Sequence, residues 1–471
     1  MNKQIYKYLL LLIAGGTLLG SCSKSFVTKN PYNELPINEA LNTPTVLASD
    51  LEACYAELRG TDQYGRDWPV IGDLMADNTF LESRNSGRYI VQYGYIVPIT
   101  DGVTDGIWSE SYNGILNCNE IINSGVAGAS ATIAQAYAIR ALLYFKLVTF
   151  FATNYTADSS ALGVPLITTF NPTYLPERAS VGTIYNQIVS DLKNALTLGP
   201  PSYSNSVTLS QYAIEGLLAR VYMYMGDYTD ALAAAQDVIN SGPFQLVSAG
   251  QFTSFWADAG IHSDAVEVMF EIDFDAINNN GYDDLGGIYI NGYQDLYCSS
   301  QLANLYTNTD VRKQLLIWGT TKSGDSAWLV NKYPNATATD PDNPKVIRLA
   351  EVYLIAAECE NQLGNDGQAQ SYVNAVAEAR DPANLTGYTD LGPALLADIV
   401  QERRKELAFE GDRLYDLNRL GLAINRANNP GSTPLGNGLS IPYPADQRIG
   451  PIPQAEILRN PNIASEQNPG Y

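Results

Sequence analysis

Histidine is almost absent from this chain of 471 residues. His262 is the only one, so a zinc site built from several histidines is excluded, and a Ser-His or Cys-His catalytic pair would need that single residue. It lies in a polar stretch without a recognisable nucleophile motif. The chain also lacks a Walker-type phosphate loop and a dinucleotide fingerprint. We therefore predict that the protein is not an enzyme and that it holds no catalytic metal.

Positive charge is scarce as well. The chain has 28 Lys and Arg residues against 50 Asp and Glu residues, for a formal net charge of −22 at pH 7. A surface this acidic repels phosphate backbones, and no basic stripe interrupts it. Nucleic acid is therefore not an expected partner. With 45% hydrophobic and 17% charged residues, the composition is nonetheless typical of a globular chain.

Cysteine is sparse and scattered. Beyond Cys22, the sequence has Cys54, Cys118, Cys298 and Cys359, with no CxxC pair and no metal-ligand spacing. Cys118 and Cys359 fall in helical apolar patterns, where a small buried thiol is the common outcome. Although export would permit disulfides, the spacing predicts no particular pairing.

The first 22 residues have the pattern of a bacterial lipoprotein leader. Lys3 and Lys7 precede an apolar run from residue 9 to residue 19, which is too short to span a bilayer and fits a secretory signal. The run ends in LGSC at residues 19–22, which resembles a lipobox. That resemblance implies removal of residues 1–21 and acylation of Cys22, including palmitate. Since no later apolar stretch approaches ~20 residues, we expect an anchored protein that does not cross the membrane.

The remaining chain shows the apolar spacing of paired helices. After Ser210, apolar residues four apart predict a helix to Met225, Gly226-Asp227 breaks it, and a second stripe covers 231–239. The pattern returns at 349–363 and 369–377, and helices are also expected at 134–151 and 184–196, the last with Ser180 as N-cap. Residues 219–235 resemble a tetratricopeptide repeat. We therefore predict an all-α fold, an α-α superhelix of tetratricopeptide-like hairpins with long loop-rich insertions.

Two of these insertions, residues 60–106 and 252–344, are rich in Gly, Asn, Asp and Tyr and contain short β-like runs such as 268–274. Long loops on a compact protein usually carry function or disorder, and the 31 tyrosines argue against disorder. The last forty residues, from Asn428, are dense in Pro, Gly and Asn and are expected to form an ordered wrap over the scaffold.

Aromatic rings with a polar tip suit sugar binding, because a ring covers the apolar face of a pyranose while nearby Asn, Asp and Arg groups bond its hydroxyls. We expect most aromatic residues in the insertions to pack loop against scaffold, and the ligand contacts to come from a few. The candidates in the first insertion are Tyr64, Trp68, Asn78, Arg84, Arg88, Tyr89 and Tyr93, and those in the second are Tyr282, Tyr289, Asn291, Tyr293, Tyr297, Trp318 and Trp328.

A short acidic loop raises the question of calcium. Seven oxygen-bearing residues gather in it: Asp273, Asp275, Asn278, Asn279, Asn280, Asp283 and Asp284. Calcium prefers such ligands, but their spacing is not that of an EF-hand. A turn-rich loop with side-chain-to-backbone hydrogen bonds explains the composition equally well. No cofactor is therefore predicted, and calcium remains an alternative.

Short motifs stand in a fixed order over nearly the whole chain. After the lipobox come DLMADN at 73–78, WSESY at 108–112, AIRA at 138–141, LGVPL at 162–166 and RASV at 178–181. The most specific segments are VIRLAEVYL at 346–354, ERRKELAFEGDR at 402–413, and an ending with IPQAEI at 452–457 and QNPGY at 467–471. Any one of these would be weak evidence alone, but in this order they resemble the SusD/RagB family of Bacteroidota lipoproteins.

That resemblance implies a cell-surface outer-membrane lipoprotein that binds a glycan and delivers it to a SusC-type TonB-dependent transporter. It further implies one SusD-like domain at 22–471, with an N-terminal part at about 22–240 and a C-terminal part at about 250–471. One departure concerns the membrane face, since surface-destined members often carry acidic residues after the lipidated cysteine. Here the sequence reads CSKSF at residues 22–26.

Three alternatives stay open. The protein could be a family member that carries peptides in place of glycans. A deep acidic groove on the protein would favour that function. A glycosidase needs only two suitably spaced carboxylates, but nothing singles out a pair, and Glu402, Glu406 and Glu410 are better explained as an ion-pair network. A periplasmic scaffold that binds only proteins would use the helical repeats alone. The sequence does not give the identity of the glycan or its linkage.

Overall fold

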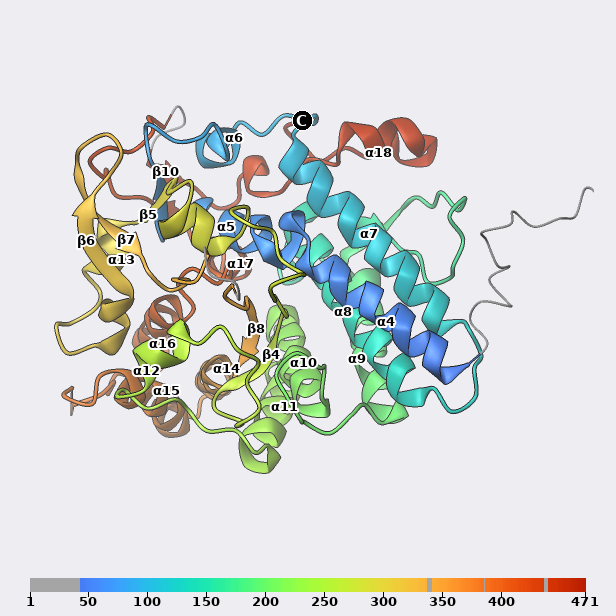
Figure 1. Cartoon of the computed structure of the whole chain (residues 1–471), viewed down its shortest axis with the longest axis horizontal. Helices are drawn as coiled ribbons and strands as arrows, with labels where there is room; N and C mark the ends of the chain where they lie inside the picture. Colours follow the sequence, from blue (N-terminus) through green and yellow to red (C-terminus); the bar gives the residue numbers. More distant parts are fainter. Residues whose placement is uncertain (1–42, 337–340, 385, 436–438) are drawn as a thin grey trace, which may run out of the picture.

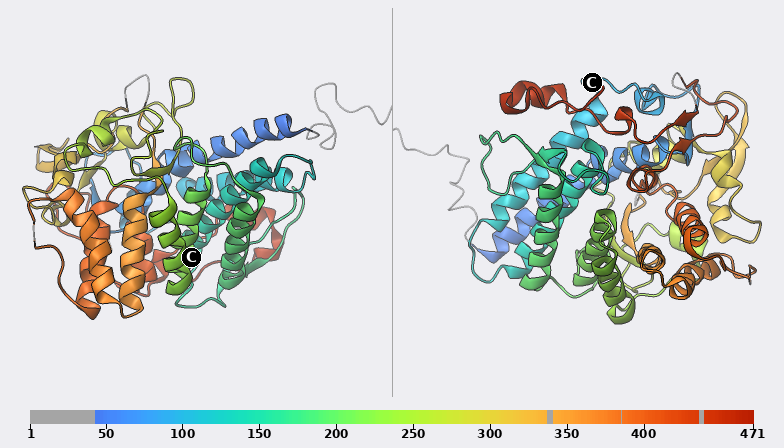
Figure 2. Two further views of the ribbon diagram at one scale, coloured as in Figure 1. Left: turned by 90° about the horizontal axis from the view of Figure 1, so that it is seen from below. Right: turned by 180° about the vertical axis from the view of Figure 1, so that it is seen from behind.

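A row of helices packed side by side forms the framework of the protein. The computed structural model describes residues 43–336, 341–384, 386–435 and 439–471, so the predicted leader and Cys22 lie outside the described residues. The row runs in chain order and is visible from behind in Figure 2. Its members are α4 (Pro44–Arg59), α7 (Gly102–Ile122), α8 (Ser130–Phe151), α9 (Val181–Leu198), α10 (Gln211–Met225), α11 (Tyr228–Ser241), α14 (Leu349–Gln362), α15 (Asp366–Arg380) and α16 (Gly392–Glu406).

The helix boundaries follow from local sequence chemistry. The Ser210 hydroxyl accepts the backbone N–H of Ala213 at the start of α10, and Gly226 ends that helix with a φ of 74°, a left-handed conformation that glycine adopts without strain. The Ser180 hydroxyl accepts the N–H of Thr183 in the same way at the start of α9. The predicted helical hairpins and the mostly helical tetratricopeptide-like fold are therefore confirmed.

Helix α8 corrects one expectation. We expected no stretch after the leader to approach the length of a membrane span, yet α8 has 22 residues and is apolar enough by composition to qualify. It lies between α7 and α9, and 83% of its apolar window is buried inside the protein. A helix that is apolar all round marks the core of a large protein as well as a membrane span. Its position identifies α8 as a core helix.

Short elements in the long insertions surround one side of this row (Figure 1). The largest is an antiparallel four-stranded sheet in the order β1-β5-β7-β6, and β6 is its edge. The strands are β1 (Thr79–Leu81), β2 (Leu162–Pro165), β3 (Arg178–Ser180), β4 (Val268–Glu271), β5 (Leu296–Cys298), β6 (Leu316–Thr320), β7 (Ser326–Val330), β8 (Lys345–Arg348), β9 (Ile424–Asn425) and β10 (Ser440–Ile441). The short helices are α5 (Asp67–Leu74), α6 (Ile90–Gly94), α12 (Phe252–Ala257), α13 (Ser300–Ala303), α17 (Arg413–Arg419) and α18 (Gln454–Arg459), with single turns η1 (Thr61–Gly65), η2 (Gly287–Asn291), η3 (Val311–Leu315), η4 (Asp446–Arg448) and η5 (Pro461–Ile463).

The predicted ion-pair role of Glu402, Glu406 and Glu410 is confirmed. Arg312 Nη1 lies 2.6 Å from a carboxylate oxygen of Glu402 and 3.1 Å from one of Glu406. Arg348 lies 2.9 Å from Glu406 and 2.7 Å from Glu410. All five side chains are buried, and α16 ends at Glu406, so Glu410 belongs to the turn that follows. These charges tie the end of α16 to β8 and to η3.

Two further expectations concern the cysteines and the C-terminus. Cys54, Cys118, Cys298 and Cys359 are all buried free thiols. The C-terminal segment wraps back onto the scaffold, where the side-chain amide of Asn468 donates to the carbonyl of Phe151 at 2.8 Å. The described part of this segment therefore packs on the scaffold, as its composition indicated. The division of the SusD-like domain into two parts stays a prediction.

Candidate functional site

The hairpin of β6 and β7 carries two tryptophans side by side. Trp318 stands directly opposite Trp328 in the strand register, and their ring centroids lie 5.0 Å apart at an interplanar angle of 64°. Trp318 is 59% exposed and Trp328 is half-buried. Because β6 is the edge strand, the hairpin lies at the margin of the molecule (Figure 1). Trp318 thus presents an aromatic ring to solvent, and the half-buried ring of Trp328 packs against it.

A charged and aromatic cluster lies beside the tip of this hairpin. The guanidinium of Arg88 covers the ring of Tyr293 at 3.8 Å from the ring centroid. It also donates to the Ser86 hydroxyl at 2.9 Å and to a carboxylate oxygen of Asp283 at 3.2 Å. Tyr282, next to Asp283, is 56% exposed. Rings and hydrogen-bonding groups of both charges therefore meet within one small surface.

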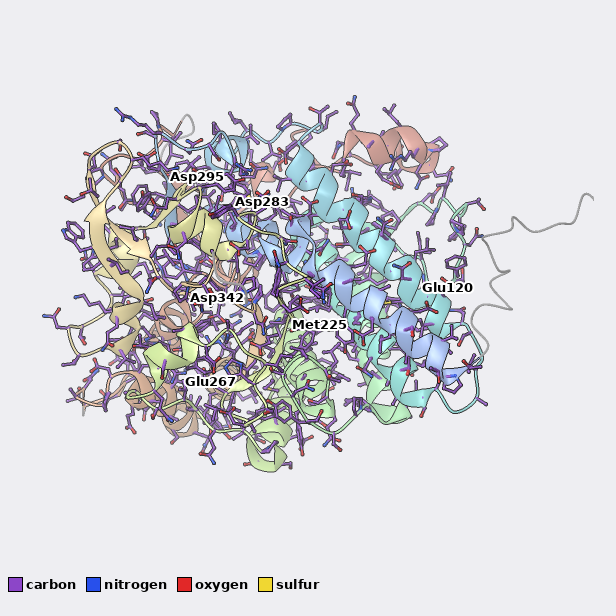
Figure 3. All side chains as sticks on the ribbon, viewed as in Figure 1. Glu120, Met225, Glu267, Asp283, Asp295 and Asp342 are labelled. Atoms are coloured by element: carbon purple, nitrogen blue, oxygen red, sulfur yellow. The ribbon has the colours of Figure 1, made fainter. Side chains whose placement is uncertain are left out.

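Buried carboxylates hold these loops together. Asp295 is fully buried, accepts the backbone N–H of Ser86 at 3.0 Å, and pairs with Lys322 Nζ at 3.1 Å. Glu82, also fully buried, accepts the backbone N–H of Ser323 at 2.8 Å. Residues 82–88, 282–295 and 316–330 are thus fixed to one another, and we call them the loop face. Figure 3 shows Asp283 and Asp295 close together in this region.

Seven predicted site residues lie at the surface of the loop face, and two of them, Arg88 and Trp328, are described above. Tyr282 and Trp318 are exposed, Tyr293 is half-buried, and Arg84 and Asn291 are exposed. Arg84 donates to the carbonyl of Lys322 at 3.3 Å, and the Asn291 amide donates to that of Pro334 at 2.6 Å. The sequence analysis missed Lys322 and Asp295, because no spacing within either insertion links them to residues 82–88.

Six predicted aromatic residues are internal instead, namely Tyr64, Trp68, Tyr89, Tyr93, Tyr289 and Tyr297. Trp68 is only 6% exposed, because its ring stacks on that of Tyr415 with centroids 4.7 Å apart and an interplanar angle of 10°. Tyr289 is fully buried and lies nearly parallel to the ring of Tyr333, with centroids 6.3 Å apart. These rings pack between insertion and scaffold, and neither offers a face to a ligand in this conformation.

Polar partners surround three of the internal candidates, Asn78, Tyr89 and Tyr93. Asn78 is fully buried and donates to Asp73 at 2.6 Å. Tyr89 is 3% exposed and donates its hydroxyl to the carboxylate of Asp67. Tyr93 is 2% exposed, and the guanidinium of Arg426 lies 4.8 Å from its ring centroid. Burying a polar group is costly unless it is hydrogen-bonded, so these partners explain why such side chains can point inward. The candidate ligand contacts are accordingly reduced to those on the loop face.

The acidic loop at 273–284 uses its oxygens internally. Asp275 accepts the backbone N–H groups of Ile277 and Asn278 at 2.6 and 2.7 Å, which is the pattern of an Asx turn. Burial raises the pKa of Asp284 to about 7. Within the described residues, no group of three or more His, Cys, Asp or Glu side chains is arranged to hold a metal ion. Calcium binding stays an untested alternative.

The single histidine does not face a nucleophile. His262 is 7% exposed, and its ring Nδ1 lies 3.0 Å from the carboxylate of Glu271. The Ser206 hydroxyl donates to the same carboxylate and not to the ring. Lys345 Nζ lies 3.4 Å from the other oxygen of Glu271. The arrangement is a buried ion-pair cluster between β4 and β8 and lacks the nucleophile-to-base hydrogen bond of a triad.

Comparisons with known proteins agree with the fold. A family model described as SusD family matches residues 321–471, and one described as starch-binding associating with outer membrane matches residues 25–223. SusD-like protein P2 of Formosa agariphila is 28% identical over an alignment that covers 100% of both chains. This relative therefore matches the chain over its whole given length.

Several solved structures have a similar fold. A SusD superfamily protein from Bacteroides thetaiotaomicron is 29% identical with a TM-score of 0.82, covering 91% of this chain and 100% of its own. One from Bacteroides vulgatus is 28% identical with a TM-score of 0.81, covering 91% and 99%. At 19% identity and a TM-score of 0.71, surface glycan-binding protein A from Bacteroides thetaiotaomicron shares the fold. With its helical scaffold, its insertions and its ordered motifs, this chain matches SusD family models in both of its halves and has the fold of SusD superfamily structures.

Proposed function

We propose that the protein binds a glycan at the loop face and does not react with it. The observation that carries the proposal is the set of exposed rings, Trp318, Tyr282 and Tyr293, beside the charged groups of Arg88 and Asp283. Such rings cover the C–H face of a sugar, while charged groups bond its hydroxyls. The starch-binding description of the family model that matches residues 25–223 supports the same ligand class.

The geometry favours modest affinity. Rings at the surface of a shallow site exclude little water, so we expect a dissociation constant in the micromolar range or weaker, about −8 kcal/mol or less favourable. The internal partners of Asp295 and Glu82 fix the loops before the ligand arrives, which limits the entropy lost on binding. A partner that encloses the ligand would add the remaining contacts.

Calorimetric titration against a panel of glycans tests this proposal. We expect Trp318→Ala and Tyr293→Ala each to weaken binding by roughly fivefold, which corresponds to about 1 kcal/mol per lost ring contact. Tyr174→Ala is the matched control, because Tyr174 is 50% exposed but lies outside the loop face. Glycan affinities that are identical in all four proteins would refute the loop face as the site.

The same titration separates the alternatives. Peptides bound tightly, with no glycan bound, would make the protein a peptide carrier. New reducing ends released from polysaccharides by the purified chain would make it a glycosidase. We expect neither result, because within the described residues the only histidine is tied into an ion-pair cluster and the best-marked glutamates serve structure.

We further propose that the protein is a lipoprotein anchored through Cys22 after removal of residues 1–21, faces the cell exterior, and delivers its glycan to a SusC-type TonB-dependent transporter. Affinity purification from solubilised outer membranes should recover the transporter in stoichiometric amount. Cys22→Ser should release the protein from the membrane fraction. Protease added to intact cells should degrade the protein, whereas a protected protein would support the periplasmic scaffold.

A further inference from the structure

Two buried thiols lie on helices that pack against each other. Cys54 belongs to α4 and Cys118 to α7, and both are fully buried and carry a free thiol. The two helices lie side by side in Figure 1 and are in contact. Two thiols that face each other can be oxidised to a disulfide, so the alignment of α4 with α7 decides whether this pair can be joined.

Contacts between the two helices define that alignment. A Cβ at Gly114 on α7 would lie 3.5 Å from the Cβ of Glu57 on α4, and the side-chain amide of Asn117 donates to the Glu57 carboxylate at 3.4 Å. Further on, a Cβ at Gly106 would meet the carboxyl group of Asp62, which follows α4. Residue numbers therefore rise along α4 as they fall along α7, so the two helices are antiparallel.

This alignment places Cys54 opposite Cys118. Cys54 lies one turn before Glu57, and Cys118 lies one turn after Gly114, so the two steps run in the same direction along an antiparallel pair. The Cβ separation of 3.5 Å at Glu57 and Gly114 falls within the ~3.5–4.5 Å that a disulfide requires. The two thiols also hydrogen-bond each other, and burial together with that bond raises the pKa of Cys118 well above its ordinary value.

The other two described cysteines have different surroundings. Cys298 lies on β5, which pairs with β1 and β7, and its thiol donates to the carbonyl of Ser299 at 3.4 Å. Cys359 lies on α14, which packs on α10, α11, α15 and α16. Because β5 and α14 belong to separate parts of the fold, we expect both of these residues to remain thiols.

We propose that Cys54 and Cys118 form a disulfide when the chain folds in an oxidising compartment. The thiolate of one cysteine attacks the disulfide of a thioredoxin-like oxidant, and the second cysteine then attacks the mixed disulfide. An Sγ–Sγ bond forms between the two cysteines, and the oxidant takes up their two electrons and two protons and leaves as a dithiol. Because both thiols are fully buried in the folded chain, the reaction takes place before α4 closes onto α7.

The bond would join α4 to α7 and close a loop from residue 54 to residue 118. A disulfide that closes a long loop stabilises a protein mainly by restricting its unfolded chain. Since α4 is the first helix that the structure describes, the bond would also fasten the scaffold to the segment that leads from the proposed lipid anchor at Cys22. That role rests on the proposed function, whereas the disulfide itself can be tested without it.

Counting thiols tests the disulfide. The mature chain, residues 23–471, is exported to the periplasm of a bacterial host behind a general secretory signal, so the result does not depend on the chain's own leader. The purified chain is unfolded, alkylated with N-ethylmaleimide and weighed by intact-mass spectrometry. Of its four cysteines we expect two to be alkylated without reductant and all four after reduction, with one cross-linked peptide pair that contains residues 54 and 118. Four alkylated cysteines without reductant, or a cross-link to residue 298 or 359, overturns the proposal.

Variants locate the bond. Cys54→Ala and Cys118→Ala should each leave three cysteines that are all alkylated without reductant, because the partner thiol is freed. Cys298→Ala and Cys359→Ala are the matched controls, since they remove equally buried thiols and should leave one alkylated cysteine. If Cys54→Ala still protects two cysteines from alkylation, a different pair is oxidised and the proposal is wrong. The cross-linked peptides of the wild-type chain decide the question if a variant does not fold.

Discussion

Replacing Glu406 by glutamine should destabilise the fold more than any exposed substitution can. Glu406 belongs to a network of ten buried or nearly buried charged groups, each within 3.4 Å of an opposite charge. Figure 3 labels one of its members, Glu267. Its cations are Arg312, Lys332, Arg348, Arg380 and Lys405, and its anions are Glu267, Asp310, Glu402, Glu406 and Glu410. Five positive charges against five negative ones leave a net charge of zero.

Glu406→Gln leaves this interior with one uncompensated positive charge. The carboxylate accepts from Arg312, Arg348 and Arg380, and a glutamine would also turn an amide donor toward these cations. Removing one partner of a buried ion pair costs about 3–5 kcal/mol. We therefore expect that loss in the free energy of unfolding at pH 7, measured by urea denaturation with tryptophan fluorescence and circular dichroism.

The pH dependence of this loss provides a second check. Burial alone would raise the pKa of Glu406, but Arg380, Arg348 and Arg312 hold it well below its usual range. The stabilisation from a carboxyl with a depressed pKa is complete above the pKa of the unfolded chain, about 4.3, and is lost as the pH falls through the folded value. The difference between wild type and Glu406→Gln should therefore be full at pH 7 and shrink below about pH 4.

The exposed Glu378 on α15 is the matched control, and Glu378→Gln should change stability by less than about 0.5 kcal/mol. If Glu406→Gln unfolds within about 1 kcal/mol of wild type at pH 7, the network contributes little, and the reasoning from buried charge is wrong.

Three further predictions concern the scaffold. Ser210→Ala removes the N-cap of α10 and should cost about 1 kcal/mol in urea denaturation. Gly72→Ala should strongly lower the melting temperature, because a Cβ there would lie 1.9 Å from the carbonyl oxygen of Gly411, whereas Gly367→Ala meets no atom within 4 Å and should be neutral. Burial and the nearby Glu351 raise the pKa of Asp412 to about 8, so the native state keeps a proton that the unfolded chain has released above about pH 4. Stability should fall as the pH rises from 4 to 8, and Asp412→Asn should flatten that slope in unfolding measurements.

The helical scaffold could be predicted because its signals are local. The Ser210 cap, the break at Gly226 and the apolar stripe between them lie within seventeen residues, and one turn of helix relates each apolar position to the next. The loop face could not be predicted in this way. Arg88 and Tyr293 come from different insertions, and Asp295 reaches Ser86 only after the chain has folded. The residue spacing within one loop does not predict a contact with a residue of another loop.

The tyrosines show why residue type alone misidentified half of the candidate site. A tyrosine hydroxyl can reach a buried acceptor, as Tyr89 reaches Asp67 and Tyr333 reaches the carbonyl of Phe409, so a polar tip permits burial as readily as exposure. The chain has 50 acidic residues, and every residue has a backbone carbonyl, so hydrogen-bond acceptors for a tyrosine hydroxyl are present inside the protein as well as at its surface. A tyrosine-rich insertion therefore indicates an ordered loop, and does not by itself indicate a ligand-binding surface. Exposure of the ring itself, as for Tyr282, is the property that separates the two, and only the packed structure reveals it.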